Sequence, residues 1–162
     1  DWLPQETILF DSARLDRLTE VDLAEGASFL GLETIVLGRA AMGETLRRMS
    51  LLDRRIIRRD GRVQIFDPLR LTGDSLARAD GPALLAGARA FAVLILCAPH
   101  AEDVLPSLRA ALTEPDVTAA ASAMPGRVIL RAHAPDAWPL RCLLFCLFVI
   151  LWRGGLRRVW QS

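Results

Sequence analysis

Residues 13–23, ARLDRLTEVDL, alternate in character with a period of two, which is the period of a strand with one buried face. The odd positions include Leu15, Val21 and Leu23, with Thr19 among them, and the even positions include Asp16, Glu20 and Asp22. We therefore expect a half-buried strand here. Residues 28–38, SFLGLETIVLG, predict a second and more buried strand.

A hairpin is predicted at residues 54–66, RRIIRRDGRVQIF, because Asp60-Gly61 stands between two arms rich in β-formers. Pro68 and Gly73 then break the strand pattern, and the small, Gly-rich residues 77–88 resemble a linking loop. The first half of the chain is thus expected to be β structure.

The second half changes character. Residues 91–98, FAVLILCA, are continuously apolar and predict a strand covered on both faces. A helix over 104–114 is expected, capped by Asp103 with Pro106 in its first turn. Residues 117–134 predict two strands around Pro125-Gly126. A last helix is expected from a cap at Asp136 to about Trp152, ending at Gly154-Gly155, with residues 156–160 as a closing strand.

Taken together, the patterns predict a mainly β fold of the α+β class. Its first half is rich in strands, and its second half follows the order strand, helix, strand, strand, helix, with two α-helices. Residues 1–162 are expected to form a single domain, with a possible division into a β-rich part, 1–75, and an α/β part, 88–162.

Composition excludes several functions. All 20 basic residues are Arg, so neither the lysine of a phosphate loop nor a Schiff-base amine is available. The net charge of +1 offers no general attraction to nucleic acid or to anionic lipid. Three Cys in apolar runs suit buried thiols in a reducing, cytoplasmic setting.

The longest apolar run, Cys142 to Trp152, is shorter than the roughly 20 residues of a membrane span, and predicts a buried helix.

Three carboxylates are candidates for a polar site. Glu6 and Asp11 bracket the short strand-like run ETILFD, but residues five apart in a regular strand point to opposite faces, so they are not expected to bind one ion together. Glu44 closes the stretch GRAAMGE, residues 38–44. There Gly38 and Gly43 allow tight turns, and Arg39 can pair with Glu44 as part of a turn. The alternative is that Glu44 is an oxygen ligand or lines a polar passage.

Other chemistry-bearing residues are weaker candidates. His100 and His133 have no second ligand beside them in sequence, and Cys142 and Cys146, four apart, are more typical of core than of a soft-metal site. No nucleophile motif is present. An arginine run flanks the hairpin and predicts a solvated face or a docking surface: Arg54, Arg55, Arg58, Arg59 and Arg62.

Four stretches, WLPQETILFD, GRAAMGE, RRDGR and GGLRRVWQ, resemble the urease accessory protein UreD (UreH) family, in that family's order. The likeness covers the C-terminal portion of the family, so its N-terminal strands are expected to be missing. The resemblance implies a mainly β scaffold, with stacked, β-helix-like strands in its first half and no catalysis of its own. It also implies that the scaffold binds apo-urease, a helical accessory adaptor and an accessory GTPase. It implies no tightly bound cofactor, but nickel in transit to urease along a polar passage.

Within that resemblance, Glu6, Asp11 and Glu44 are the candidates for lining the nickel passage. Arg39, Gly38 and Gly43 are expected to hold the local turn, and Arg58 and Arg59 to contribute to an interaction surface. No nucleic acid and no membrane partner is expected. Two alternatives stay open: a ferredoxin-like module that binds a ligand or nucleic acid without catalysis, and a hydrolase that uses one of the three carboxylates.

Overall fold

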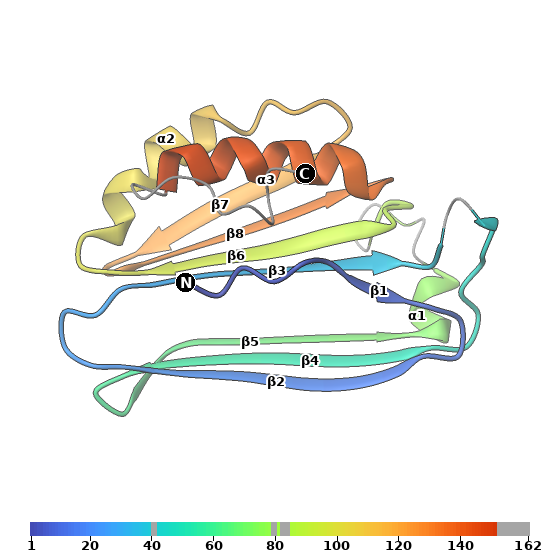
Figure 1. Ribbon diagram of the computed structural model, residues 1–162, viewed down its shortest axis with the longest axis horizontal. Helices are drawn as coiled ribbons and strands as arrows, with labels where there is room; N and C mark the ends of the chain where they lie inside the picture. Colours follow the sequence, from blue (N-terminus) through green and yellow to red (C-terminus); the bar gives the residue numbers. More distant parts are fainter. Residues whose placement is uncertain (40–41, 79–80, 82–84, 152–162) are drawn as a thin grey trace.

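The computed structural model describes residues 1–39, 42–78, 81 and 85–151. In this part of the chain, two β-sheets lie face to face and helices cover the outer face of the larger sheet (Figure 1). The five-stranded sheet has the order β1 (Thr7–Leu9), β3 (Phe29–Leu37), β6 (Ala90–Cys97), β8 (Arg127–Ala134), β7 (Thr118–Met124). The three-stranded sheet has the order β2 (Arg14–Leu23), β4 (Ser50–Arg59), β5 (Arg62–Thr72). The helices are α1 (Gly73–Leu76), the 3₁₀ helix η2 (Ala101–Val104), α2 (Leu105–Ala110) and α3 (Ala137–Leu151).

The first four strands form two turns of a β-helix-like coil. The chain passes from one sheet to the other and back, so that β1 pairs with β3 and β2 pairs with β4, both in parallel. A coil of this kind lets strands that are two apart in sequence become neighbours in space, as Figure 1 shows. The prediction of mainly β structure, with stacked strands in the first half, is confirmed. The five-stranded sheet takes strands from both halves of the chain.

Strand β2 alternates between exposed and half-buried residues along its whole length, as its sequence predicts. Its apolar face packs between the sheets, where two hydrophobic clusters form. One cluster is centred on Ile35, Leu51 and Phe91. The other is centred on Ile57, Ile65 and Ile95. These clusters hold the three-stranded sheet against β1, β3 and β6.

The hairpin at Asp60-Gly61 is confirmed, and both residues have the positive φ angles of 48° and 73° that a tight two-residue turn requires. The strand pattern was predicted to break at Pro68 and at Gly73. The prediction is wrong for Pro68, because β5 runs through this residue and ends at Thr72. Proline is tolerated here because β5 is an edge strand, where a missing N–H leaves no neighbour unpaired.

In the second half, β6 is a buried strand, and β7 and β8 form a hairpin around Pro125-Gly126, as predicted. Asp136 caps the last helix by accepting a hydrogen bond from the Trp138 N–H at 2.9 Å. The predicted cap at Asp103 is wrong, because this residue lies inside η2 and the side chain before α2 makes no capping bond. Pro106 does occupy the first turn of α2.

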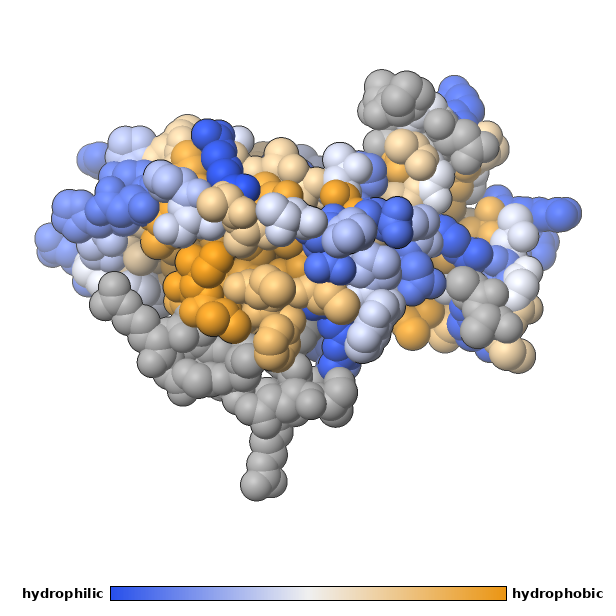
Figure 2. Space-filling model, turned by 90° about the horizontal axis from the view of Figure 1, so that it is seen from above, coloured by the Kyte–Doolittle hydropathy of each residue, from blue (hydrophilic) through white to orange (hydrophobic). Residues whose placement is uncertain are grey.

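Helix α3 contributes one face to the largest core, with Leu140, Leu143, Leu144, Leu147 and Phe148 buried against the five-stranded sheet. Its other face is also apolar but exposed, so the prediction of a fully buried helix is wrong. Figure 2 looks onto this side of the molecule and shows hydrophobic side chains gathered on its surface. The exposed residues are Trp138, Phe145, Val149 and Ile150.

None of the described helices has the length and apolar character needed to cross a membrane. The predicted end of the last helix at Gly154-Gly155 and the closing strand over 156–160 lie outside the described residues.

Candidate functional site

A group of buried charged side chains lies between the two sheets. Strand β4 turns alternate residues inward, and Asp53 and Arg55 share this inner face with Leu51 and Ile57. The strand pairing then places Asp67 of β5 directly opposite Arg55, and Arg17 of β2 directly opposite Asp53. Glu33 of β3 and Arg131 of β8 approach from the facing sheet. We call these six residues the inter-sheet charge cluster: Arg17, Glu33, Asp53, Arg55, Asp67 and Arg131.

Arg55 lies at the centre of this cluster, and its guanidinium contacts three carboxylates. Its Nε donates to Glu33 Oε2 at 2.7 Å, its Nη1 donates to Asp67 Oδ2 at 2.6 Å, and its Nη2 donates to Asp53 Oδ2. A planar guanidinium is suited to this arrangement because its N–H groups diverge in fixed directions. Arg55 and all three of its partners are buried, and Asp53 is fully inaccessible.

Two further arginines complete the charge balance. Arg17 donates from Nε and Nη2 to the two oxygens of Asp53, at 2.9 and 2.8 Å, and also contacts Glu33 at 3.1 Å. The hydrogen bond to Asp53 raises the pKa of Arg17. Arg131 donates from Nη2 to Asp67 Oδ1. Three arginines thus face three carboxylates, and the cluster is electrically neutral.

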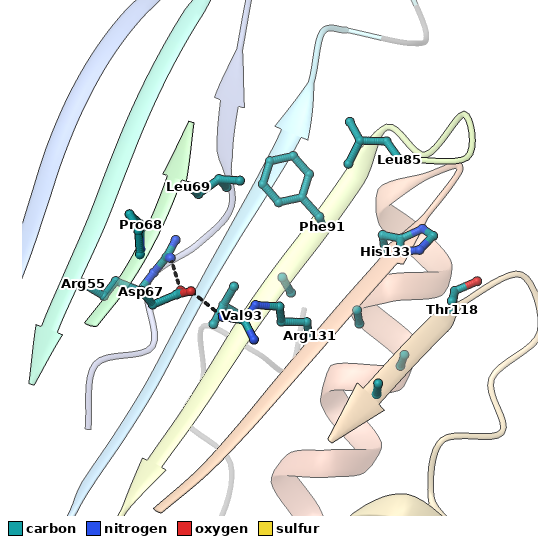
Figure 3. A pocket seen from close by; sticks show the side chains of 14 residues that line it. Arg55, Asp67, Pro68, Leu69, Leu85, Phe91, Val93, Thr118, Arg131 and His133 are labelled. Atoms are coloured by element: carbon teal, nitrogen blue, oxygen red, sulfur yellow. Dashed lines mark hydrogen bonds and ion pairs between the residues drawn. The ribbon is translucent and has the colours of Figure 1, made fainter. Parts of the chain in front are cut away.

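A cavity of about 430 Å³ leads from the surface to one end of the charge cluster. Figure 3 shows Asp67 held between Arg55 and Arg131 at its polar end, with Leu69, Leu85 and Phe91 along its apolar part. His133 and Thr118 line the opposite side. Arg131 is 59% exposed, so the cluster reaches solvent through this residue.

Two of the predicted carboxylates, Asp11 and Glu44, fasten one loop to another. Glu44 accepts hydrogen bonds from the backbone N–H groups of Asp11 and Arg39, both at 3.0 Å, and from Arg39 Nε at 3.1 Å. These donors, led by the Asp11 N–H, lower the pKa of Glu44 from 4.5 to about 2. Asp11 Oδ1 in turn accepts from the N–H groups of Arg47 and Arg48, at 2.7 and 2.8 Å, and these bonds lower its pKa.

The same loop contains the predicted turn residues. Gly38 and Gly43 both have positive φ, of 72° and 66°. Gly38 also lies close to Arg89, whose Nη2 would be 2.9 Å from a Cβ at this position. The Arg39 guanidinium stacks over the Phe10 ring, 4.7 Å from its centroid. The Arg39–Glu44 pair and the two glycines therefore form a turn, as the sequence suggests.

Glu6 lies in different surroundings. It faces α3, where its Oε1 is 4.0 Å from Arg141 Nη1, and it lines a separate cavity of about 260 Å³ together with Asp136. The structure therefore brings Asp11 and Glu44 together through a backbone hydrogen bond and gives Glu6 another set of neighbours. Whether any of the three meets nickel stays a prediction.

The arginine run at the hairpin divides between two faces. Arg58 forms an ion pair with Glu20 at 2.9 Å, and Arg59 donates to the carbonyl oxygens of Ala24 and Ala27. The prediction of a solvated or docking face is wrong for Arg55, which points inward. Cys146 is exposed and Cys142 half-buried, so the expectation of core thiols holds only for Cys97.

The charge cluster itself was not predicted from sequence. The usable signal was Glu33, a carboxylate inside the otherwise apolar run SFLGLETIVLG. A buried charge of this kind needs a partner. In the described part of the chain no group of three or more His, Cys, Asp and Glu side chains could hold a metal ion. The cluster's carboxylates are instead neutralised by arginines.

Comparison with known proteins gives a consistent family. A protein family described as "UreD urease accessory protein" matches residues 1–161. A urease accessory protein UreD of Paracoccus denitrificans is 57% identical over 161 residues, which is 99% of this chain and 58% of that protein. A UreD of Cereibacter sphaeroides is 52% identical over 162 residues, which covers 59% of its length. A protein named UreD 3 of Methylorubrum extorquens is 47% identical and is covered over 55% of its length.

The chain therefore spans well under two thirds of the length of these relatives, whereas the match covers almost all of its own residues. The family match covers residues 1–161, and the sequence identities to these relatives are near one half. Identity at this level shows family membership and not only a similar fold. The chain belongs to the UreD urease accessory protein family.

Proposed function

We propose that this chain acts in urease maturation as a non-catalytic scaffold, which binds apo-urease and the other accessory proteins and helps nickel reach the urease active site. The proposal is supported by membership of a family whose relatives are named urease accessory proteins. The structural observation that carries it is the inter-sheet charge cluster, which places carboxylate oxygens in the protein interior, where a cavity reaches one of them, Asp67.

The chemistry of the cluster suits a cargo ion better than a resident one. Carboxylate oxygens bind a divalent ion less tightly than thiolates and imidazoles do, so an ion held by them can be released. Each carboxylate is already paired with arginine, so an entering cation would have to displace a guanidinium before it could bind. We infer that nickel occupies these oxygens only briefly, with Asp67 as the first that it meets from the cavity.

The loop carboxylates have a second place in the proposal. Asp11 and Glu44 accept hydrogen bonds from backbone N–H groups, which leaves less of their oxygen surface for an ion. We propose that they and Arg39 fix the loop, and that Glu6, beside its own cavity, is the freer candidate of the original three. A Glu44→Ala variant that folds and still supports urease activation would remove Glu44 from the passage.

The proposal is tested by co-expressing the gene that encodes this chain with urease subunits and the remaining accessory genes. Asp67→Asn is expected to lower urease activity and nickel content several-fold while the chain still co-purifies with apo-urease. The matched control is Asp16→Asn, which alters an exposed carboxylate that also pairs with an arginine. Equal nickel content in both variants and in the unaltered chain would contradict the assignment of Asp67.

A further inference from the structure

A second cavity, of about 260 Å³, lies between the start of α3 and the β1–β3 edge of the five-stranded sheet. Glu6, just before β1, and Thr34 of β3 supply one side of its lining. The other side comes from the first turns of α3 and the residue that caps this helix, and includes Asp136, Trp138 and Arg141. We call this space the α3 cavity.

Thr34 gives the first sign that the α3 cavity holds a ligand. Its side chain points to the helix-covered face of the sheet, because the preceding residue, Glu33, points into the inter-sheet charge cluster. Thr34 is 7% exposed, and in the described part of the chain its Oγ1 has no hydrogen-bond partner. Buried hydroxyls are nearly always hydrogen-bonded, because an unmade bond costs stability. A hydroxyl in this position is placed to bind a molecule that enters the cavity.

The charged groups that line the α3 cavity are of both signs. Glu6 and Asp136 present carboxylates, and Arg141 presents a guanidinium. Glu6 Oε1 lies 4.0 Å from Arg141 Nη1, which is beyond hydrogen-bond distance for these two atoms. Asp136 accepts a hydrogen bond from the N–H of Trp138. A carboxylate accepts up to about four hydrogen bonds and a guanidinium donates about five, so these contacts leave capacity for a ligand.

We propose that the α3 cavity binds a small zwitterion that carries a carboxylate and a primary ammonium group, such as an α-amino acid. The ligand carboxylate pairs with the guanidinium of Arg141, whose parallel N–H groups match two carboxylate oxygens. The ligand ammonium donates to Glu6, Asp136 and Thr34, which offer an acceptor for each of its three N–H groups. A simple anion would be repelled by the two carboxylates, and a bare metal cation by the guanidinium.

The uncharged part of the lining favours an apolar side chain on the ligand. Ala137 and Leu144 offer apolar contacts, and the Trp138 ring is 69% exposed, so it can close over a bound molecule from the solvent side. The cavity volume is just below the roughly 300–1,000 Å³ of typical small-molecule pockets, which suits a free amino acid better than a peptide. Binding of this ligand depends on neither urease nor nickel.

NMR titration of this chain with L-leucine tests the proposal. The backbone amides of Thr34, Trp138 and Arg141 should shift along one saturable binding curve. Thr34→Val keeps the shape of the side chain but removes the hydroxyl, and should weaken binding about tenfold, as expected for one lost hydrogen bond to a charged group. Without ligand, the same variant should unfold at a temperature roughly 2–4 °C higher, because it no longer buries a hydroxyl that has no partner among the described residues.

The matched control variant is Thr113→Val, because Thr113 is exposed and lies outside the α3 cavity, and it should bind L-leucine unchanged. Two analogues each lack one charged group of L-leucine: isoamylamine lacks the carboxylate, and isocaproate lacks the ammonium. Each should bind the unaltered chain at least about tenfold more weakly than L-leucine does. Because the analogues are titrated into the unaltered chain, they test the ligand class even if Thr34→Val does not fold.

The absence of a saturable shift with L-leucine in the folded chain would overturn the proposal. Unchanged binding to a folded Thr34→Val variant, or binding of either analogue as tight as that of L-leucine, would also overturn it. Nickel chloride is titrated separately, because Glu6 is a candidate for the nickel passage as well. Shifts at these amides that nickel produces and L-leucine does not would overturn the zwitterion site and leave the proposed function in place.

Discussion

Replacement of Arg55 by Met should be among the most damaging single changes in this chain. The side chain of Arg55 is 5% exposed and pairs with Glu33, Asp53 and Asp67. Without it, the cluster would hold three carboxylates against two arginines, one of which, Arg131, is mostly in solvent. Removing one partner from a buried ion pair costs about 3–5 kcal/mol, since the remaining charge stays buried and unpaired.

Urea unfolding followed by circular dichroism would measure this loss. For a slope of about 2 kcal/mol per M, the midpoint should fall by roughly 2 M. The neighbouring residue supplies a matched control, because Arg54 points outward and pairs with the exposed Asp16. Exposed ion pairs contribute about 0–1 kcal/mol, so Arg54→Met should leave the midpoint nearly unchanged. A loss below about 1 kcal/mol for Arg55→Met, or equal losses for both variants, would show that Arg55 does not balance the buried carboxylates.

Three further predictions follow from local geometry. The pKa of Glu44 is lowered from 4.5 to about 2. Its contribution to the free energy of unfolding is therefore complete above pH 4.5 and is lost as the pH falls towards 2. An NMR titration of its carboxyl carbon with a midpoint near 4.5 would contradict this. Gly73→Ala should lower the free energy of unfolding, measured by thermal unfolding, by about 1–3 kcal/mol, because the new Cβ would lie 2.1 Å from a backbone carbonyl oxygen. Gly26→Ala is the control, because there is open space around Gly26. It should lose only about 1 kcal/mol, from the strain of its positive φ. Cys146 is exposed and Cys97 buried, with a pKa raised by burial, so a disulfide reagent should modify Cys146 at least about a hundredfold faster, and equal rates would show that the core is open.

The strands could be predicted because their signals are local. The period of two in β2 and the Asp60-Gly61 turn each depend on a few adjacent residues, and both predictions are confirmed. The pairing of Arg55 with Asp67 could not be predicted in this way. A bulge between Ile57 and Arg58 shifts the register of the hairpin, and a regular ladder counted back from the turn would place a different residue opposite Arg55.

The sequence also did not predict that the side chain of Arg55 points inward. Residues 50–59, SLLDRRIIRR, carry apolar and charged residues at both parities, so the sequence does not distinguish the inner face of β4 from the outer one. The buried charges pair only because the fold brings β3 and β4 together from different sheets. The ion pair between Arg39 and Glu44 could be predicted from the sequence, because the two residues are close in the chain and next to glycines.

The most direct test of the proposed role is whether the product of the gene that encodes this chain binds apo-urease. Tagged protein would be co-expressed with urease subunits in nickel-free medium and recovered from the lysate, with tagged chain carrying Arg55→Met as a folding control. We expect the unaltered protein to retain the urease subunits, and the destabilised Arg55→Met variant to retain less of them. Failure of a soluble, folded protein to retain them, with the other accessory proteins present, would contradict it.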